Sequence, residues 1–208
     1  IIIMKSLLRV VLICSIFCSL AFTTHDAFKD KTTTVVIDVS HGGSDSGVTF
    51  DQTSEKQIIL EISQLIKDKN INKNIKIEFT REGDNAINLS ERVAFINQLK
   101  PDLVLSLHIA SHPERSVSGI EIFVAEESKT YEKSHMLAEK LKNKFDSKNN
   151  DVDAKIKNAD FFLMKQSNHP ILTVELGFLT NETDRLSLQD PFEQAAIAET
   201  ILDFISEI

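Results

Sequence analysis

The sequence has few cysteines, only a short hydrophobic run and no cluster of basic residues. Its two cysteines, Cys14 and Cys18, both lie in an apolar N-terminal segment, so the rest of the chain has no disulfide and no thiolate ligand for a metal. That segment, from Val10 to Phe22, is about thirteen residues long, whereas a membrane-spanning helix needs roughly 20. The lack of cysteine beyond this segment excludes a disulfide-stabilised fold and a cysteine-ligated metal site.

Basic residues are outnumbered throughout the chain. Lys and Arg number 23 against 31 Asp and Glu, and the formal net charge is −8 at pH 7. Loss of an N-terminal segment that contains Lys5 and Arg9 changes this charge to −10. An acidic protein without a basic cluster binds polyanions poorly, so nucleic acid is excluded as a partner.

The N-terminus has the pattern of a secretory signal peptide. We predict this signal over residues 1–21, with Met4 as the initiator and with Lys5 and Arg9 before the apolar run. Ser19-Leu20-Ala21 offers small residues at the positions that a signal peptidase reads. We therefore expect an exported protein of a bacterium, in the periplasm, the cell envelope or outside the cell. It would have no stable membrane association after cleavage; an uncleaved N-terminal anchor is the alternative.

The remainder divides into a polar linker, residues 22–33, and one domain, residues 34–208, which is long enough to bury a core. Apolar runs alternate with helical periodicity along this domain. We expect strands at 34–39, 75–80, 103–107, 120–125, 161–164 and 171–176, and helices at 55–69, 90–100, 131–145 and 191–208, with Ser90 and Asp190 as N-caps. This order predicts a single α/β layered domain, with a mostly parallel central sheet of about six strands flanked by helices on both faces. The most apolar strands, 35–39 and 103–107, should be central.

Two of the six histidines, His41 and His108, directly follow the predicted central strands. The carboxyl ends of neighbouring parallel strands meet at one edge of a sheet, where ligands bind in open α/β folds. Two histidines there could face one cavity and share a metal ion. The other four, in the linker, in loops and on a charged helix, are interpreted as exposed polar residues: His25, His112, His135 and His169.

Two glutamates are candidates for the same edge. Glu55 begins the helix after the His41 loop, where it could ligate a metal or interact with the helix dipole. Glu175 lies late in an apolar strand, where a carboxylate is costly unless it is paired or functional. It could act as a base beside a metal-bound water, or it could anchor the turn at Gly177.

With these residues, the chain resembles a known family, the zinc-dependent N-acetylmuramoyl-L-alanine amidases of the amidase type 3 family, which hydrolyse bacterial cell walls. The resemblance covers residues 34–208 and depends on motifs that follow one another in order. These are Ile37-Asp38-Val39-Ser40-His41-Gly42-Gly43 with Asp45 and Gly47, Ser54-Glu55-Lys56, Thr80-Arg81 with Asp84, Leu89-Ser90-Glu91-Arg92, Ser106-Leu107-His108, Gly119 with Glu121 and Phe123, and Val174-Glu175-Leu176-Gly177-Phe178-Leu179-Thr180-Asn181.

The resemblance implies that His41, Glu55 and His108 bind one zinc ion per chain and that Glu175 is the catalytic general base. Arg81, Glu91 and Arg92 are interpreted as structural contacts. Two departures from the family pattern stand near the site. Val39-Ser40 replaces the usual Pro-Gly before the first histidine, and Ala110 replaces an asparagine after the second.

The sequence therefore predicts a monomeric, zinc-dependent N-acetylmuramoyl-L-alanine amidase. Its partner would be peptidoglycan, and it would cleave the amide bond between N-acetylmuramic acid and the L-alanine of the stem peptide. Two alternatives stay open. One is a zinc carboxypeptidase-like hydrolase of wall peptides, and the other is a non-catalytic peptidoglycan-binding or sensing domain.

Overall fold

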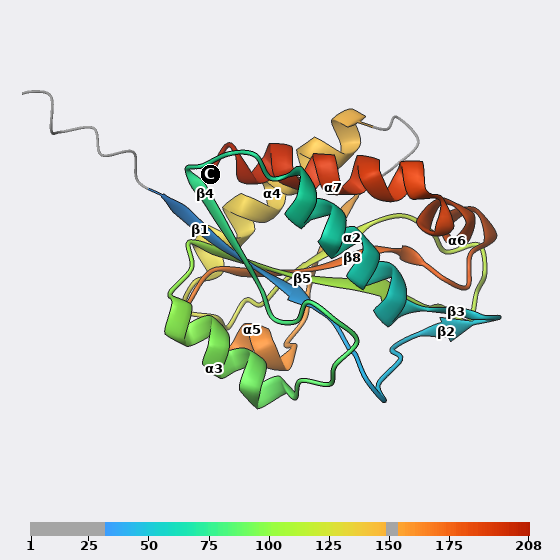
Figure 1. Ribbon diagram of the computed structural model, residues 1–208, viewed down its shortest axis with the longest axis horizontal. Helices are drawn as coiled ribbons and strands as arrows, with labels where there is room; N and C mark the ends of the chain where they lie inside the picture. Colours follow the sequence, from blue (N-terminus) through green and yellow to red (C-terminus); the bar gives the residue numbers. More distant parts are fainter. Residues whose placement is uncertain (1–31, 149–153) are drawn as a thin grey trace, which may run out of the picture. The chain divides into compact units, whose positions relative to one another are not determined.

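The computed structural model describes residues 32–148 and 154–208 (Figure 1). The predicted signal peptide, nearly all of the predicted linker and His25 lie outside the described residues. Within the described ranges, no helix is both long enough and apolar enough to cross a lipid bilayer.

The centre of the fold is a six-stranded sheet in the order β4-β1-β5-β8-β6-β7. All neighbouring strands are parallel except β6 and β8. The mostly parallel six-stranded sheet is thus confirmed, with β1 and β5 in the interior as predicted. The strands are β1 (Thr33–Val39), β4 (Ile75–Phe79), β5 (Leu103–Ala110), β6 (Glu121–Val124), β7 (Lys155–Asn158) and β8 (Ile171–Phe178). A separate antiparallel hairpin is formed by β2 (Thr49–Phe50) and β3 (Thr53–Ser54).

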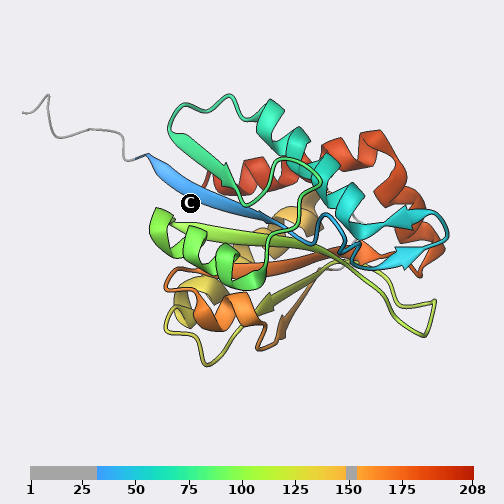
Figure 2. The same ribbon diagram turned by 60° about the horizontal axis from the view of Figure 1, so that its bottom comes forward.

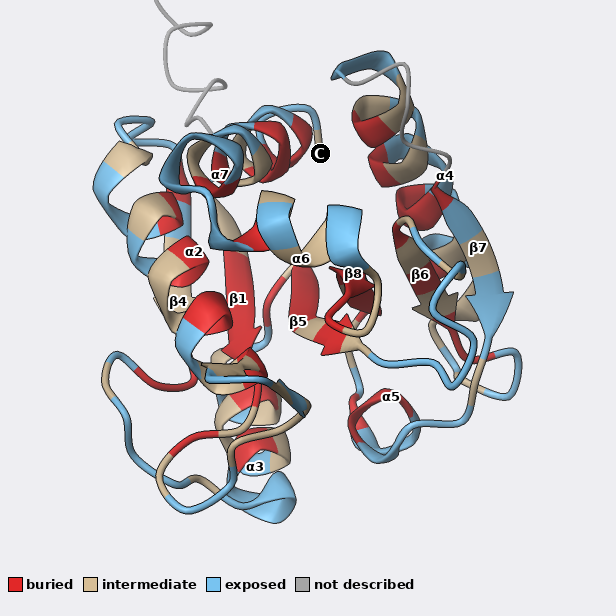
Figure 3. Cartoon of the chain, turned by 90° about the vertical axis from the view of Figure 1, so that its right-hand side faces the viewer, coloured by how far each residue is buried: buried red, intermediate tan, exposed pale blue. Residues whose placement is uncertain are grey.

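Helices cover both faces of this sheet (Figures 1 and 2). One face carries α2 (Glu55–Lys69), α4 (Tyr131–Lys148), α6 (Glu182–Gln189) and α7 (Pro191–Ile205), and the other carries α3 (Leu89–Leu99) and α5 (Phe162–Gln166). Each face has its own apolar cluster, a large one beneath the first group and a smaller one beneath α3 and α5. Figure 3 shows the buried residues concentrated in the central strands and on the inner sides of the helices.

Local sequence signals account for α2 and α7. Helix α2 has the predicted bounds because its isoleucines recur at helical spacing, and Ile58, Ile59 and Ile62 are buried against the sheet. Helix α7 begins at Pro191, and the Asp190 carboxylate caps it by accepting a hydrogen bond from the Phe192 backbone N–H at 2.7 Å. The bounds of α2 and the start and cap of α7 are confirmed, whereas α7 ends at Ile205 and not at residue 208.

Two local predictions are wrong. Residues 161–164, expected as a strand, lead into the short helix α5, since a brief apolar run does not distinguish a strand from a buried helical turn. The cap of α3 is Asn88 and not Ser90. The Asn88 side chain accepts from the Glu91 N–H at 2.9 Å, and the Glu91 carboxylate accepts from the Asn88 N–H at 3.0 Å, which together form a capping box.

Strands β5 and β8 are longer than expected. The sequence suggested that β5 ends before His108, but the strand continues to Ala110, so His108 lies inside it. Likewise β8, which was expected to end at Leu176, continues to Phe178. The two side chains are therefore held by the central ladder of the sheet, where His108 is opposite Glu175.

Candidate metal centre

The sheet face beneath α3 and α5 changes character along its three central strands. The first row across β1, β5 and β8 is apolar and packs beneath α3 and α5; it consists of Val36, Val104 and Ile171. The second row is polar and consists of Asp38, Ser106 and Thr173. The third row holds two of the predicted functional residues, His108 and Glu175. The second and third rows line a cavity of about 920 Å³, bordered by the first residues of α3 and by Phe161 and Phe162.

His41 is presented to this cavity by a tightly held turn after β1. Its φ of 56° is in the left-handed region, which is uncommon for a residue with a side chain. Two buried arginines bind the carbonyl groups of the turn. Arg81 donates to the Val39 and Ser40 carbonyls at 3.1 and 2.8 Å, and Arg92 donates to the His41 carbonyl at 2.7 Å. The turn that contains the unusual Val39-Ser40 pair is thus stabilised by side chains from elsewhere in the fold, and both arginines make structural contacts.

Arg92 is itself held by a buried carboxylate. Its Nη1 donates to Asp38 Oδ1 at 2.6 Å, and both side chains are almost fully buried. Ser106 and Thr80 donate to the same carboxylate at 2.6 and 2.9 Å. This network fastens the end of β1 to β5 and α3 directly beneath the His41 turn.

Replacement of Arg92 by methionine is expected to destabilise the fold by about 3–5 kcal/mol, because it leaves the buried Asp38 charge without its partner. Urea unfolding followed by circular dichroism measures this loss. Lys67→Met is the matched control, since Lys67 forms an exposed ion pair with Glu82 at 2.8 Å and should contribute little. A loss below about 1 kcal/mol for Arg92→Met would contradict a structural role for the Asp38–Arg92 pair.

Glu55 is the first residue of α2, and only 2% of its surface is exposed. Backbone amides fix both carboxylate oxygens: Val48 N–H donates to Oε2 at 2.8 Å, and Ile109 N–H donates to Oε1 at 3.1 Å. The Ser40 hydroxyl also donates to Oε1, at 3.4 Å. These donors come from the His41 loop and from β5, so the carboxylate is oriented by the two segments that carry the histidines.

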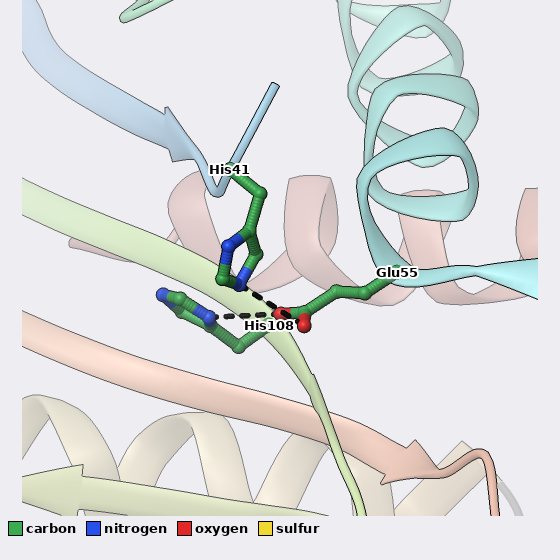
Figure 4. Close-up of side chains that lie close together, drawn as sticks. All are labelled: His41, Glu55 and His108. Carbon is green, nitrogen blue, oxygen red and sulfur yellow. Dashed lines mark hydrogen bonds and ion pairs between the residues drawn. The ribbon is translucent and has the colours of Figure 1, made fainter. Parts of the chain in front are cut away.

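The predicted ligands meet at this carboxylate (Figure 4). His41 Nε2 lies 3.0 Å from Glu55 Oε2, and His108 Nδ1 lies 2.9 Å from Glu55 Oε1. One ligand atom from each of the three residues lies within 4.8 Å of the other two. Among the described residues, this is the only group of three or more such side chains close enough to hold a metal ion.

The donor set fits zinc. Two imidazoles and one carboxylate form a ligand set that catalytic zinc sites use, with a further position for water or substrate. The outer shell also fits, because Asp45 Oδ2 lies 2.8 Å from His41 Nδ1 and orients the ring with Nε2 toward the cluster. Gly47 (φ 63°) closes one side, and a Cβ there would come within 2.6 Å of His41 Cδ2. Any side chain at position 47 would thus clash with His41, and glycine leaves this space open.

Electrostatics at the cluster favour charged side chains. Burial by itself would lower the pKa of His41, but the carboxylates of Glu55 and Asp45 outweigh burial and raise it to about 9. Burial would raise the pKa of Glu55, but hydrogen bonds from His108 and His41 outweigh it, and this pKa lies well below its usual range. The site therefore contains a carboxylate that is ionised at neutral pH, as a metal ligand must be.

Glu175 is in a different environment. Its burial raises the pKa of the carboxyl to about 7, and the neighbouring Glu55 and Glu121 act in the same direction. Its Oε2 is one of only two buried side-chain N or O atoms without a hydrogen-bond partner in the described parts of the chain. Glu175 lines the cavity but is not one of the three clustered residues. A carboxylate with one unpartnered oxygen beside this cluster is able to accept a proton there.

The structure also shows which residues the sequence reasoning missed. Three residues that support the cluster were not identified as such: Asp38, Asp45 and Gly47. Only Asp38 could have been noticed in the sequence, because it is an acidic residue in the apolar run 35–39. Asp45 and Gly47 have roles that depend on the path of the loop. His112, His135 and His169, interpreted as polar surface residues, do not line the cavity.

A family model described as N-acetylmuramoyl-L-alanine amidase matches residues 35–207 of the chain. Among curated proteins, YqiI of Bacillus subtilis is 31% identical over 202 residues, an alignment that covers 97% of each chain. The N-acetylmuramoyl-L-alanine amidase LytC of the same organism is 30% identical over 172 residues, which are 82% of this chain and 34% of LytC. The chain thus spans about a third of the length of LytC.

Solved structures agree with these relatives. An N-acetylmuramoyl-L-alanine amidase from Clostridium difficile 630 superposes with a TM-score of 0.80 at 26% identity, covering 85% of this chain and 96% of that one. The amidase AmiC2 of Nostoc punctiforme gives a TM-score of 0.77 at 26% identity, with the same coverage of 85% and 96%. The α/β fold is therefore shared with solved amidases over most of this chain.

Proposed function

Because this chain belongs to the N-acetylmuramoyl-L-alanine amidase family, whose members are peptidoglycan hydrolases, we propose that it cleaves the amide bond between N-acetylmuramic acid and L-alanine with one zinc ion held by His41, Glu55 and His108. The observation that carries this proposal is the convergence of these three ligands beside the unpartnered carboxylate of Glu175.

Each residue of the cluster has a distinct task in this proposal. His41 and His108 donate ring nitrogens, and Glu55 donates a carboxylate whose orientation the Val48 and Ile109 amides fix. Asp45 accepts a hydrogen bond from Nδ1–H of His41 and so keeps Nε2 available as a ligand. Zinc bound there would polarise the scissile carbonyl and increase the acidity of water.

Glu175 carries the proton. Its Oε2 takes a proton from the attacking water and then delivers it to the nitrogen of the departing L-alanine, so that the leaving group departs as a neutral amine. A base works best when its pKa is near the operating pH, and burial brings the pKa of Glu175 to about 7. The absence of a hydrogen-bond partner at Oε2 supports this role, because a purely structural carboxylate would have its oxygens satisfied.

The products of digestion distinguish the proposed reaction from its alternatives. We expect the purified protein with zinc to release intact stem peptides from peptidoglycan, each with L-alanine at its N-terminus, as read by mass spectrometry. Release of single C-terminal amino acids would instead identify a carboxypeptidase. Stoichiometric zinc with no product of either kind would favour a binding or sensing domain.

Peptidoglycan lies outside the cytoplasm, so the proposed reaction requires export. The charged and apolar segment at 1–21 supports this as a signal peptide. Mass spectrometry of the N-terminus of the exported protein tests it, with cleavage after Ala21 as the expected result. A single catalytic domain that works as a monomer stays a prediction.

A further inference from the structure

The β2–β3 hairpin carries an aromatic side chain, Phe50, that contacts the guanidinium groups of two arginines. Val48, whose N–H binds the Glu55 carboxylate, lines the cavity and leads directly into β2. Phe50 follows two residues later, about 7 Å along an extended strand. The hairpin and α6 are neighbours at the same end of the fold (Figure 1), and a hydrogen bond between Gln189 and Thr53 joins them. Phe50 thus follows a cavity-lining residue closely in the chain, on a hairpin that is linked to α6.

Two arginines from separate segments face this ring. The Arg185 guanidinium carbon, from α6, lies 4.6 Å from the Phe50 ring centroid. The Arg115 guanidinium carbon lies 5.3 Å from the same centroid and comes from the loop after β5, whose first residue, Ser111, lines the cavity. Both distances are within the range of cation–π contacts. The ring therefore lies between two cations, on segments that lead away from the cavity-lining residues Val48 and Ser111.

Neither guanidinium forms an ion pair with any residue in the ranges 32–148 and 154–208. Arg185 donates instead to the Leu179 carbonyl at 3.0 Å, and the nearby Asp184 carboxylate accepts from the Phe178 and Gly119 amides. Two like charges near one ring repel each other weakly in water, and an anion placed between them would be attracted by both.

The opposite side of the cavity is apolar. Leu89, Phe161 and Phe162 border it on the α3 and α5 face, and 51%, 40% and 44% of their surfaces are exposed. The cavity thus has an apolar border at α3 and α5, whereas its lining residues Val48 and Ser111 lead to the two arginines. A substrate that spans the centre must match both.

The substrate of the proposed reaction has two unlike halves. The scissile amide joins an uncharged N-acetyl sugar to a stem peptide that can carry free carboxylates. Since each half must leave the centre in its own direction, charge complementarity assigns the peptide to the arginine side and the sugar to the apolar side. An extended peptide advances about 3.3–3.6 Å per residue, so a stem that runs along the hairpin would carry its second residue about as far from the centre as Phe50 lies beyond Val48.

We propose that Arg115 and Arg185, supported by the Phe50 ring, bind the free carboxylate of the second residue of the stem peptide and make the enzyme selective for stems that are not amidated there. This inference rests on the proposed amidase function and adds a specificity site to it. The two arginines touch neither the scissile bond nor the metal ligands. They are specificity residues that act on substrate affinity.

Two matched substrates test the inference. Each is a muramyl tripeptide with an amidated C-terminus, and the two differ only in whether the second residue carries an α-carboxylate or an α-carboxamide. We expect the wild type to prefer the carboxylate. Arg115→Gln and Arg185→Gln should each raise KM for the carboxylate substrate by about 10-fold, the usual size for a charge-assisted hydrogen bond, with kcat nearly unchanged. KM for the carboxamide should not move.

Lys165→Gln is the control for general electrostatic attraction, because Lys165 is exposed on α5 at the apolar side of the cavity. If it raises KM as much as the arginine variants, the effect is not local and the inference is overturned. The inference also fails if the arginine variants affect both substrates equally and lower the melting temperature, since that pattern identifies them as supports of the hairpin. Zinc content is measured in every variant.

Failure of this inference is distinguishable from failure of the amidase function. Cleavage of both substrates at equal rates by the wild type and the arginine variants would overturn the specificity site and leave the amidase function intact. If the wild type cleaves neither substrate, the amidase function fails. Calorimetric binding of the two free peptides then still tests the arginines, and equal affinity for carboxylate and carboxamide would overturn their role.

Discussion

Removal of zinc by a chelator is expected to reduce peptidoglycan hydrolysis to the background rate, with recovery when zinc is restored. His41, Glu55 and His108 are the only described residues that could hold the ion together. A metal that polarises a carbonyl and activates water contributes several kcal/mol to the transition state, which corresponds to a loss of about 10³-fold or more. Release of soluble wall fragments measures the rate, and metal analysis measures the zinc removed.

A pair of histidine variants makes this result specific. His108→Ala should lose stoichiometric zinc and activity together. His112→Ala should keep both, because His112 is exposed in the following loop and does not line the cavity. Bound zinc should also raise the melting temperature of the wild type, since a ligand at 100 times its Kd stabilises a protein by about 2.7 kcal/mol. Full activity after exhaustive chelation would rule out the metal-dependent reaction.

Replacement of Glu175 by glutamine is expected to lower kcat by about 10²- to 10⁴-fold, the range for loss of general acid–base catalysis. Glutamine has nearly the same shape but cannot take the water proton and return it to the leaving nitrogen. Zinc content and KM should stay close to wild type, because Glu175 is not among the three clustered residues. Turnover of a muramyl peptide measures the change, with zinc quantified in the same preparation.

Stability separates a chemical role of Glu175 from a structural one. Burial disfavours its ionised form and Oε2 has no hydrogen-bond partner, so the Glu175→Gln protein should be at least as stable as wild type. Glu121→Gln is the matched control, because Glu121 is opposite Glu175 in the sheet and pairs with Lys157 at 2.5 Å. It should change kcat by only a few-fold. Wild-type turnover by Glu175→Gln would remove Glu175 from the mechanism.

The sequence predicted the fold class, a mostly parallel sheet of about six strands and the positions of the long helices. It took residues 161–164 as a strand, however, and did not predict β7. Helix α2 was predictable to the residue because five isoleucine and leucine side chains at helical spacing start directly after a loop. The short helix α5 was not, since Phe161 to Met164 is apolar throughout and too short to show a period. The hairpin β2–β3, with two residues in each strand, was missed for the same reason.

The sequence pointed to the clustered residues and Glu175 as candidates, but not to the residues that hold them in place. His41, His108 and Glu175 stood out because each interrupts or follows an apolar strand, and the family resemblance added their roles. Arg92 was correctly interpreted as structural, but its partner could not be found in the sequence. Asp38 and Arg92 are 54 residues apart, and only the packing of α3 against the sheet brings them within 2.6 Å.

The sequence by itself therefore determined most of the elements and the identity of the candidate residues, because strand and helix periods, caps and motifs are local properties of the chain. The tertiary structure decided which of those residues meet. The register between β1 and β5 brings His41 and His108 to one edge, and the loop before α2 turns Glu55 between them. The sequence also did not predict that Phe50 contacts Arg115 and Arg185, because these residues belong to three segments that only folding brings together.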